Sequence, residues 1–73
     1  MKTFNYAKLT GKIVEVFGSQ KAYSQFMGWA ERTTSLKLNN KARFKQDEIL
    51  KTVEGLGLEM CEIPDYFFKL NAQ

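Results

Sequence analysis

The sequence contains no histidine, and it has a single cysteine, Cys61, and a single proline, Pro64. Without histidine, a Ser-His-Asp triad, a histidine general base and any histidine-containing metal site are excluded. One thiol cannot close an internal disulfide or build an all-cysteine zinc site. No glycine-rich phosphate-binding loop is recognisable either. We therefore expect no catalysis, no cofactor, no metal and no small-molecule ligand.

Long hydrophobic runs are also missing. Nowhere do about 18 apolar residues follow one another, as a membrane-spanning helix requires, and the N-terminus leads into no signal-peptide core. A lone cysteine fits a reducing cytoplasm. The 73 residues are too few for two domains of ordinary size, so we expect a single cytoplasmic domain over residues 1–73 that makes no membrane contact. A core this small gains from close helix packing or from oligomerisation.

Charge is unevenly distributed along the chain. Residues 1–45 hold nine basic and two acidic side chains, a net charge of +7, whereas residues 46–73 hold two basic and six acidic ones, a net charge of −4. Such a division favours a basic surface for a polyanion and an acidic remainder that faces elsewhere. The alternative is a solvated surface that is merely uneven in charge.

Apolar residues at helical spacing predict a first helix near the N-terminus: Tyr6, Leu9, Ile13 and Val16 or Phe17. Asn5 is suited to cap this helix and Gly18 to end it. A later helix, the fourth, is predicted by Ile49, Val53 and Leu56, and it ends at Gly57. No strand is required, although residues 65–70 could form one.

Residues 19–39 have the pattern of a helix-turn-helix. The second predicted helix starts after Ser19 and ends at Gly28, and the third runs from about residue 30 to Leu38, where asparagines follow that can end it. In this motif the second of the two helices lies in the DNA major groove and the first crosses the backbone.

The polar residues that open the third helix are the candidate base-reading residues: Glu31, Arg32, Thr33 and Ser35. Arg32 could pair with guanine, and Glu31 could accept a hydrogen bond from cytosine. The candidate phosphate contacts are one residue at the start of the second helix and four cations: Gln20, Lys37, Lys41, Arg43 and Lys45. The partner expected from these residues is double-stranded DNA.

Several apolar residues are expected in the core because they share a helical face: Phe26, Met27, Ile49, Val53 and Leu56. Cys61 is expected to be buried or half-buried. The C-terminal segment, about residues 58–73, is acidic and aromatic. Its apolar residues either fold back on the core or contact a second subunit or a partner protein: Tyr66, Phe67, Phe68 and Leu70.

The sequence also resembles the small Cro-like regulators of temperate phages, within the lambda-repressor type of helix-turn-helix protein. The residues that carry the resemblance are Tyr6-Ala7-Lys8-Leu9-x-Gly11-Lys12-Ile13, Phe17-Gly18-Ser19-Gln20-Lys21, Glu31-Arg32-Thr33-x-Ser35-Leu36-Lys37-Leu38-Asn39, Gln46-Asp47-Glu48-Ile49 and Tyr66-Phe67-Phe68. The resemblance implies an all-α, lambda-repressor-like domain of four or five helices. It further implies operator binding as a homodimer in the bacterial host, in the choice between lysis and lysogeny. In some such switches a small protein of this kind binds the phage repressor itself.

Four positions depart from the family pattern. Trp29 replaces Ile or Val, Ala30 replaces a serine N-cap, Thr34 replaces Leu or Val, and Lys45 replaces a serine that would cap the fourth helix. One explanation is repacking, in which Trp29 fills the volume that Thr34 gives up. The other is a surface adapted to a protein partner, because Trp and Arg are enriched at interface hot spots.

Two hypotheses follow. The first is a Cro-like transcriptional regulator that binds operator DNA through its helix-turn-helix. The alternative is an antirepressor that binds the DNA-binding domain of the phage repressor and modulates its operator binding. The candidate residues for a protein partner are Trp29, Arg32, Tyr66, Phe67, Phe68 and Leu70. A third reading is a protein–protein adaptor that retains a vestigial helix-turn-helix.

Overall fold

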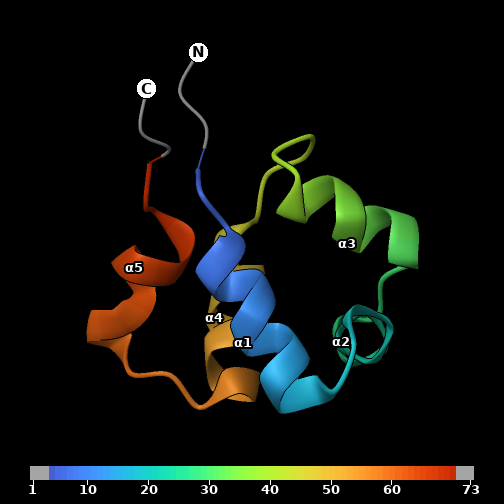
Figure 1. The fold of residues 1–73 in the computed structure, drawn as a ribbon, viewed down its shortest axis with the longest axis horizontal. Helices are drawn as coiled ribbons and strands as arrows, with labels where there is room; N and C mark the ends of the chain where they lie inside the picture. Colours follow the sequence, from blue (N-terminus) through green and yellow to red (C-terminus); the bar gives the residue numbers. More distant parts are fainter. Residues whose placement is uncertain (1–3, 71–73) are drawn as a thin grey trace.

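A computed structural model describes residues 4–70, and within them the fold is all-α (Figure 1). The elements are α1 (Ala7–Phe17), α2 (Gln20–Met27), α3 (Glu31–Leu38), α4 (Gln46–Leu56), a 3-10 helix η1 (Met60–Glu62) and α5 (Ile63–Phe67). The predicted fold class is therefore confirmed. The strand considered for residues 65–70 is not formed, because α5 occupies the first half of that segment and only an isolated antiparallel bridge joins Phe4 to Leu70.

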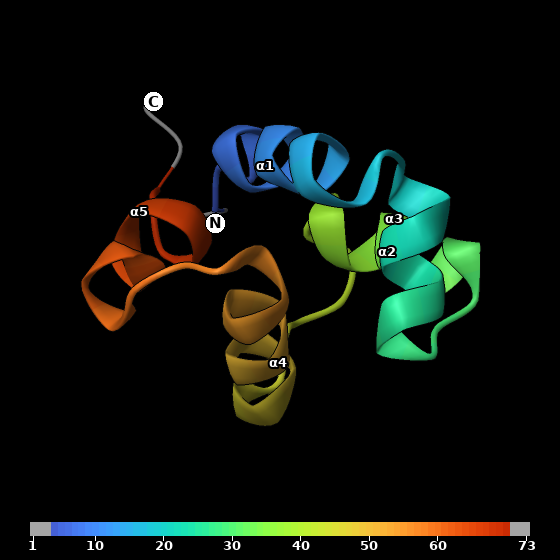
Figure 2. The ribbon, with the colours of Figure 1, turned by 90° about the horizontal axis from the view of Figure 1, so that it is seen from below.

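Helix α1 is the element around which the others are arranged. It packs against α2, α4 and α5, while α2 also packs against α3 and α4. As a result α3 and α5 lie at opposite ends of the domain, as both views show (Figures 1 and 2). No helix within residues 4–70 is long and apolar enough to cross a membrane.

The helix ends follow the local sequence. The Ser19 hydroxyl accepts a hydrogen bond from the Ala22 amide at 3.0 Å, and the Asn5 side chain accepts one from the Ala7 amide at 2.9 Å. Both contacts satisfy amides that the first turn of a helix leaves unpaired. Gly28 ends α2 at φ +76°, a left-handed backbone conformation that residues other than glycine rarely adopt. The predicted boundaries at Gly18, Ser19 and Gly28 are confirmed, whereas the N-cap of α1 is Tyr6, one residue after the predicted Asn5.

Among residues 4–70, ten apolar side chains form the core: Tyr6, Leu9, Ile13, Tyr23, Met27, Leu38, Val53, Leu56, Tyr66 and Phe67. The first helical stripe continues through Phe17, which packs against this core, while Val16 is exposed. The core prediction is confirmed for Met27, Val53 and Leu56.

Three predictions of burial need correction. Phe26 is 39% exposed, because its ring covers Phe17 and the backbone at Gly55 at the edge of the domain rather than entering the core. Ile49 is only half-buried at the margin of the core. Cys61 is exposed, because the short helix η1 turns its side chain toward solvent.

Candidate protein and nucleic-acid interfaces

The segment predicted as a helix-turn-helix consists of α2, a short turn and α3. The Gly28 amide donates to the Gln25 carbonyl at 3.2 Å and the Trp29 amide to the Ser24 carbonyl at 2.9 Å, so the turn continues the hydrogen bonding of α2. Helix α3 then begins at Glu31, and its N-cap residue Ala30 makes no side-chain capping hydrogen bond. The two helices and the turn predicted over residues 19–39 are thus present.

The predicted base-reading residues lie on the outer side of α3. Glu31, Arg32 and Ser35 are exposed, and Thr33 is half-buried. Asn39 restrains Ser35, because its side-chain Nδ2 donates to the Ser35 carbonyl at 2.8 Å and to the Ser35 hydroxyl at 3.3 Å. The fold therefore brings three of these four side chains together on an accessible surface.

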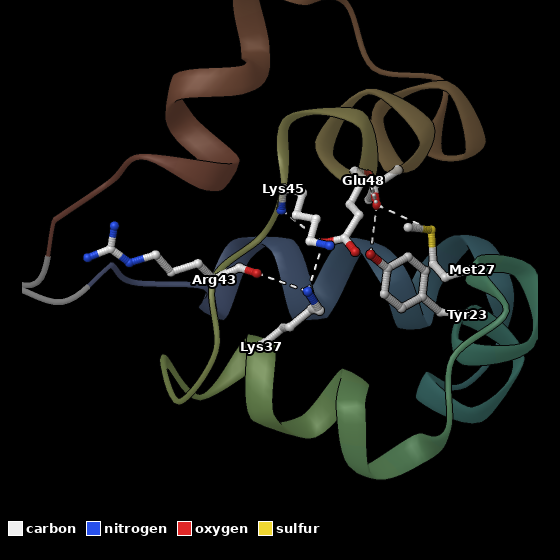
Figure 3. A network of polar contacts seen from close by, with 7 residues as sticks. Tyr23, Met27, Lys37, Arg43, Lys45 and Glu48 are labelled. Atoms are coloured by element: carbon white, nitrogen blue, oxygen red, sulfur yellow. Dashed lines mark hydrogen bonds and ion pairs between the residues drawn. The ribbon is translucent and has the colours of Figure 1, made fainter.

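The predicted phosphate contacts divide into two groups. Lys41, Arg43 and Lys45 are exposed in the loop between α3 and α4, and Figure 3 shows the Arg43 side chain extending away from the domain. Gln20 is half-buried at the start of α2, where its carbonyl accepts a hydrogen bond from the Ser24 hydroxyl at 2.9 Å.

Lys37 requires a correction, because it is only 7% exposed. Its Nζ lies 2.8 Å from the Glu48 carboxylate and 2.9 Å from the Arg43 carbonyl oxygen (Figure 3). The Trp29 ring centroid lies 4.9 Å from the same atom. An ammonium group has only three N–H donors, and these contacts occupy it. Lys37 is therefore a structural residue rather than an available phosphate contact.

Glu48 connects two parts of the chain at this point. Its carboxylate also accepts a hydrogen bond from the Lys45 amide at 2.8 Å, which preserves one half of the capping box even though Lys45 has no serine hydroxyl. Burial raises the pKa of the Glu48 carboxyl. The hydrogen bonds from Lys37 and from the Lys45 amide, together with the two lysine charges, outweigh burial and hold that pKa below its ordinary value.

The unusual residues Trp29 and Thr34 are accommodated inside the domain. Trp29 is half-buried and packs edge-on against Tyr23 and tilted against Phe44, with ring centroids 5.9 and 6.1 Å away. Thr34 is fully buried, and its hydroxyl is hydrogen-bonded to that of Ser24. These contacts favour the repacking explanation over a surface adapted to a partner.

Sequence reasoning missed a polar contact in the core. The Tyr23 hydroxyl lies 2.7 Å from the Thr52 hydroxyl, which also lies 3.6 Å from the Met27 sulfur. Burial raises the pKa of Tyr23 to about 12, so the hydroxyl stays protonated. Thr52 lies on the inner face of α4, one helical turn after Glu48. This spacing was the feature of the sequence that could have indicated the buried contact.

The aromatic C-terminal segment folds back in part. Tyr66 and Phe67 are buried, so they belong to the core and are not accessible to a partner. Phe68 and Leu70 remain about half exposed, at 50% and 48%. The Asn5 amide donates to the Lys69 carbonyl at 2.6 Å and holds this segment beside the N-terminal residues.

An apolar groove of about 460 Å³ lies between α4 and the segment formed by η1 and α5. We call it the α4–α5 groove, and its lining residues are Phe44, Gln46, Ile49, Leu50, Met60, Ile63 and Phe68. Sequence reasoning did not find it. Leu50 and Met60 are apolar residues outside the predicted core stripes. Their position was the feature of the sequence that could have indicated an exposed apolar surface.

A family model described as protein of unknown function (DUF739) matches residues 2–70. The chain belongs to the DUF739 family. Among curated proteins none matches this DUF739 chain.

A solved structure similar to this DUF739 protein is the solution structure of the modulator of repression of the temperate bacteriophage TP901-1 from Lactococcus lactis. The two sequences are 51% identical over 89% of this chain and 88% of that one, with a TM-score of 0.78. The comparison supports the resemblance to phage regulators at this general level. Because the similar protein is a modulator of repression, the match does not support the narrower assignment to the Cro-like regulators.

Proposed function

We propose that this DUF739 protein is a phage modulator of repression that binds a phage repressor and alters the repressor's binding to operator DNA. The observation that carries this proposal is the 51% identity, over nearly the full length of both chains, to a protein of that description. It favours the antirepressor hypothesis over direct operator binding.

The charge distribution supports a basic protein partner. In the acidic second part of the chain, exposed carboxylates lie on α4, on α5 and in the turn before η1: Asp47, Glu54, Asp65 and Glu59. The surface with which a repressor contacts DNA must be basic, because it neutralises phosphates. An acidic surface on the modulator would attract that basic surface and would keep it from the operator.

The decisive experiment pairs the protein with the repressor of the same phage. In size-exclusion chromatography the two should co-elute, and in a gel-shift assay the protein should weaken the repressor–operator complex as its concentration rises. Separate elution together with an unchanged gel shift would overturn the proposal.

A second candidate function is direct operator binding, supported by the exposed cations on α3 and in the loop after it. Arg32 lies on the outer face of α3, and Lys41, Arg43 and Lys45 follow in the loop. With three phosphate contacts per subunit, the logarithm of the binding constant should fall against the logarithm of the salt concentration with a slope of about −2.7 for a monomer and about −5.4 for a homodimer. Arg32→Ala should remove base preference, whereas Lys41→Ala should weaken binding to all sequences alike.

Direct binding is tested in a gel shift of operator DNA without repressor, with ultracentrifugation to determine whether the bound form is a homodimer. The absence of any salt-sensitive complex would exclude this function and leave the modulator proposal intact. In either function we propose a single non-catalytic domain acting in the cytoplasm of the bacterial host.

A further inference from the structure

The α4–α5 groove is an exposed apolar surface that the core leaves uncovered. Three of its lining side chains are large, apolar and accessible: Leu50 is 44% exposed, Met60 66% and Phe68 50%. Its volume of about 460 Å³ is in the usual range for binding pockets. Contiguous exposed apolar surface of this kind marks interaction sites in small soluble proteins.

The rim of the groove is predominantly acidic. Asp47 and Glu54 lie three residues before and four residues after Leu50, so they flank it on α4. Glu59 and Glu62 are the sequence neighbours of the lining residues Met60 and Ile63.

The basic residues next to the lining are fewer, namely Lys45 at the Phe44 end and Lys69 beside Phe68. Lys51 is directed elsewhere, with its Nζ 5.2 Å from the Phe26 ring centroid. Glu48 is neutralised by Lys37. A net negative rim around an apolar floor disfavours nucleic acid and favours a cationic, amphipathic partner.

We propose that the α4–α5 groove binds a basic amphipathic helix of a protein partner. This inference rests on the proposed function, under which the partner is the DNA-binding domain of the phage repressor. Apolar side chains of the bound helix would enter the groove at helical spacing, and its Lys and Arg side chains would meet the acidic rim. A helix held this way has its phosphate-binding charges occupied, which accounts physically for the loss of operator binding.

The position of the groove separates this site from the helix-turn-helix surface. The elements that line it include α5, which lies at the opposite end of the domain from α3 (Figures 1 and 2). Arg32→Ala should therefore leave repressor affinity unchanged, although Arg32 was a partner candidate on sequence grounds.

The test measures the affinity of the full-length chain for the full-length repressor by isothermal titration calorimetry. Leu50→Glu and Met60→Glu should each weaken binding by about 30-fold or more, as loss of an interface hot spot does. Glu54→Lys should weaken binding less, and added salt should reduce its effect.

The matched controls are Val14→Glu and Val16→Glu on α1, where the valines are 46% and 44% exposed. They should bind within about twofold of the wild type, since exposed contacts outside an interface carry no binding energy. Circular dichroism and thermal melting verify that each variant is folded.

The outcomes separate the two proposals. If wild-type protein binds the repressor and both groove variants bind equally well, the groove inference is overturned while the proposed function stands. If wild-type protein does not bind the repressor, both fail together. If Leu50→Glu abolishes self-association in ultracentrifugation but leaves repressor affinity unchanged, a second copy occupies the groove and the inference is likewise overturned.

Discussion

The Nζ of Lys37 lies 2.8 Å from a carboxylate oxygen of Glu48, joining the last turn of α3 to the first turn of α4. The side chains are only 9% and 16% exposed, so water screens this ion pair weakly. Trp29 and Phe44 cover the ammonium group, with ring centroids 4.9 and 5.9 Å from it. The pair therefore positions α3, the outer helix of the domain, relative to α4.

Lys37→Met should destabilise the fold. The substitution keeps the apolar stem but leaves the Glu48 carboxylate without its counter-ion and the Arg43 carbonyl without its donor. We expect a loss of about 2–3 kcal/mol in the free energy of unfolding, somewhat below the cost of breaking a fully buried pair. Urea unfolding followed by circular dichroism measures it. The control is Lys21→Met, an exposed residue of α2, and equal stability of the two variants would contradict the prediction.

Acidification should remove the contribution of Glu48. Its folded-state pKa is below the ordinary value, so the carboxylate stabilises the fold above about pH 4.3, and this contribution is lost as the pH falls through the folded-state pKa. The difference in unfolding free energy between wild type and Glu48→Gln should be constant between about pH 6 and 8 and shrink below about pH 5. A difference that grows on acidification would show that the sign is wrong.

The buried hydroxyl pair Ser24–Thr34 should show energetic coupling. Thr34→Val should cost about 1 kcal/mol of unfolding free energy, because it removes the hydrogen bond to Ser24 at a fully buried position. With Ser24→Ala already present, the same substitution should cost less, because the hydrogen bond between the two hydroxyls is already absent. A double-mutant cycle by chemical denaturation measures the coupling, and strictly additive effects would count against it.

Gly11→Ala should stabilise the protein. Gly11 lies inside α1, and a Cβ atom added there meets nothing within 4 Å, so alanine gains helix propensity without a clash. We expect a gain of about 0.5–1 kcal/mol in unfolding free energy. Gly28→Ala is the matched control, since it also has open space around its Cβ but φ is +76°. Thermal melting should show opposite shifts, and a stabilised Gly28→Ala would refute the conformational argument.

Features that depend on neighbouring residues could be predicted from the sequence. The Ser19 cap and the Gly28 end of α2 involve contacts within a few residues, so the amino-acid types there were enough to place them. The candidate residues of α3 were also largely accessible, because their polarity and helical spacing put them on one outer face.

Burial could not be read reliably from single residues. Lys37 carries the positive charge expected of a phosphate contact. Its ammonium group is nevertheless bound inside the fold by Glu48 and the Arg43 carbonyl, both of which lie outside α3. Tyr66 and Phe68 are equally aromatic, but only Tyr66 is covered by the rest of the fold.

Composition and local pattern alone established an all-α chain with no histidine, a basic first part and an acidic second part. Tertiary packing decided which apolar and charged side chains remained accessible, and it created the α4–α5 groove from α4, η1 and α5. The physical reason is that helix propensity and capping act over one or two turns, whereas solvent exposure depends on which helices pack together.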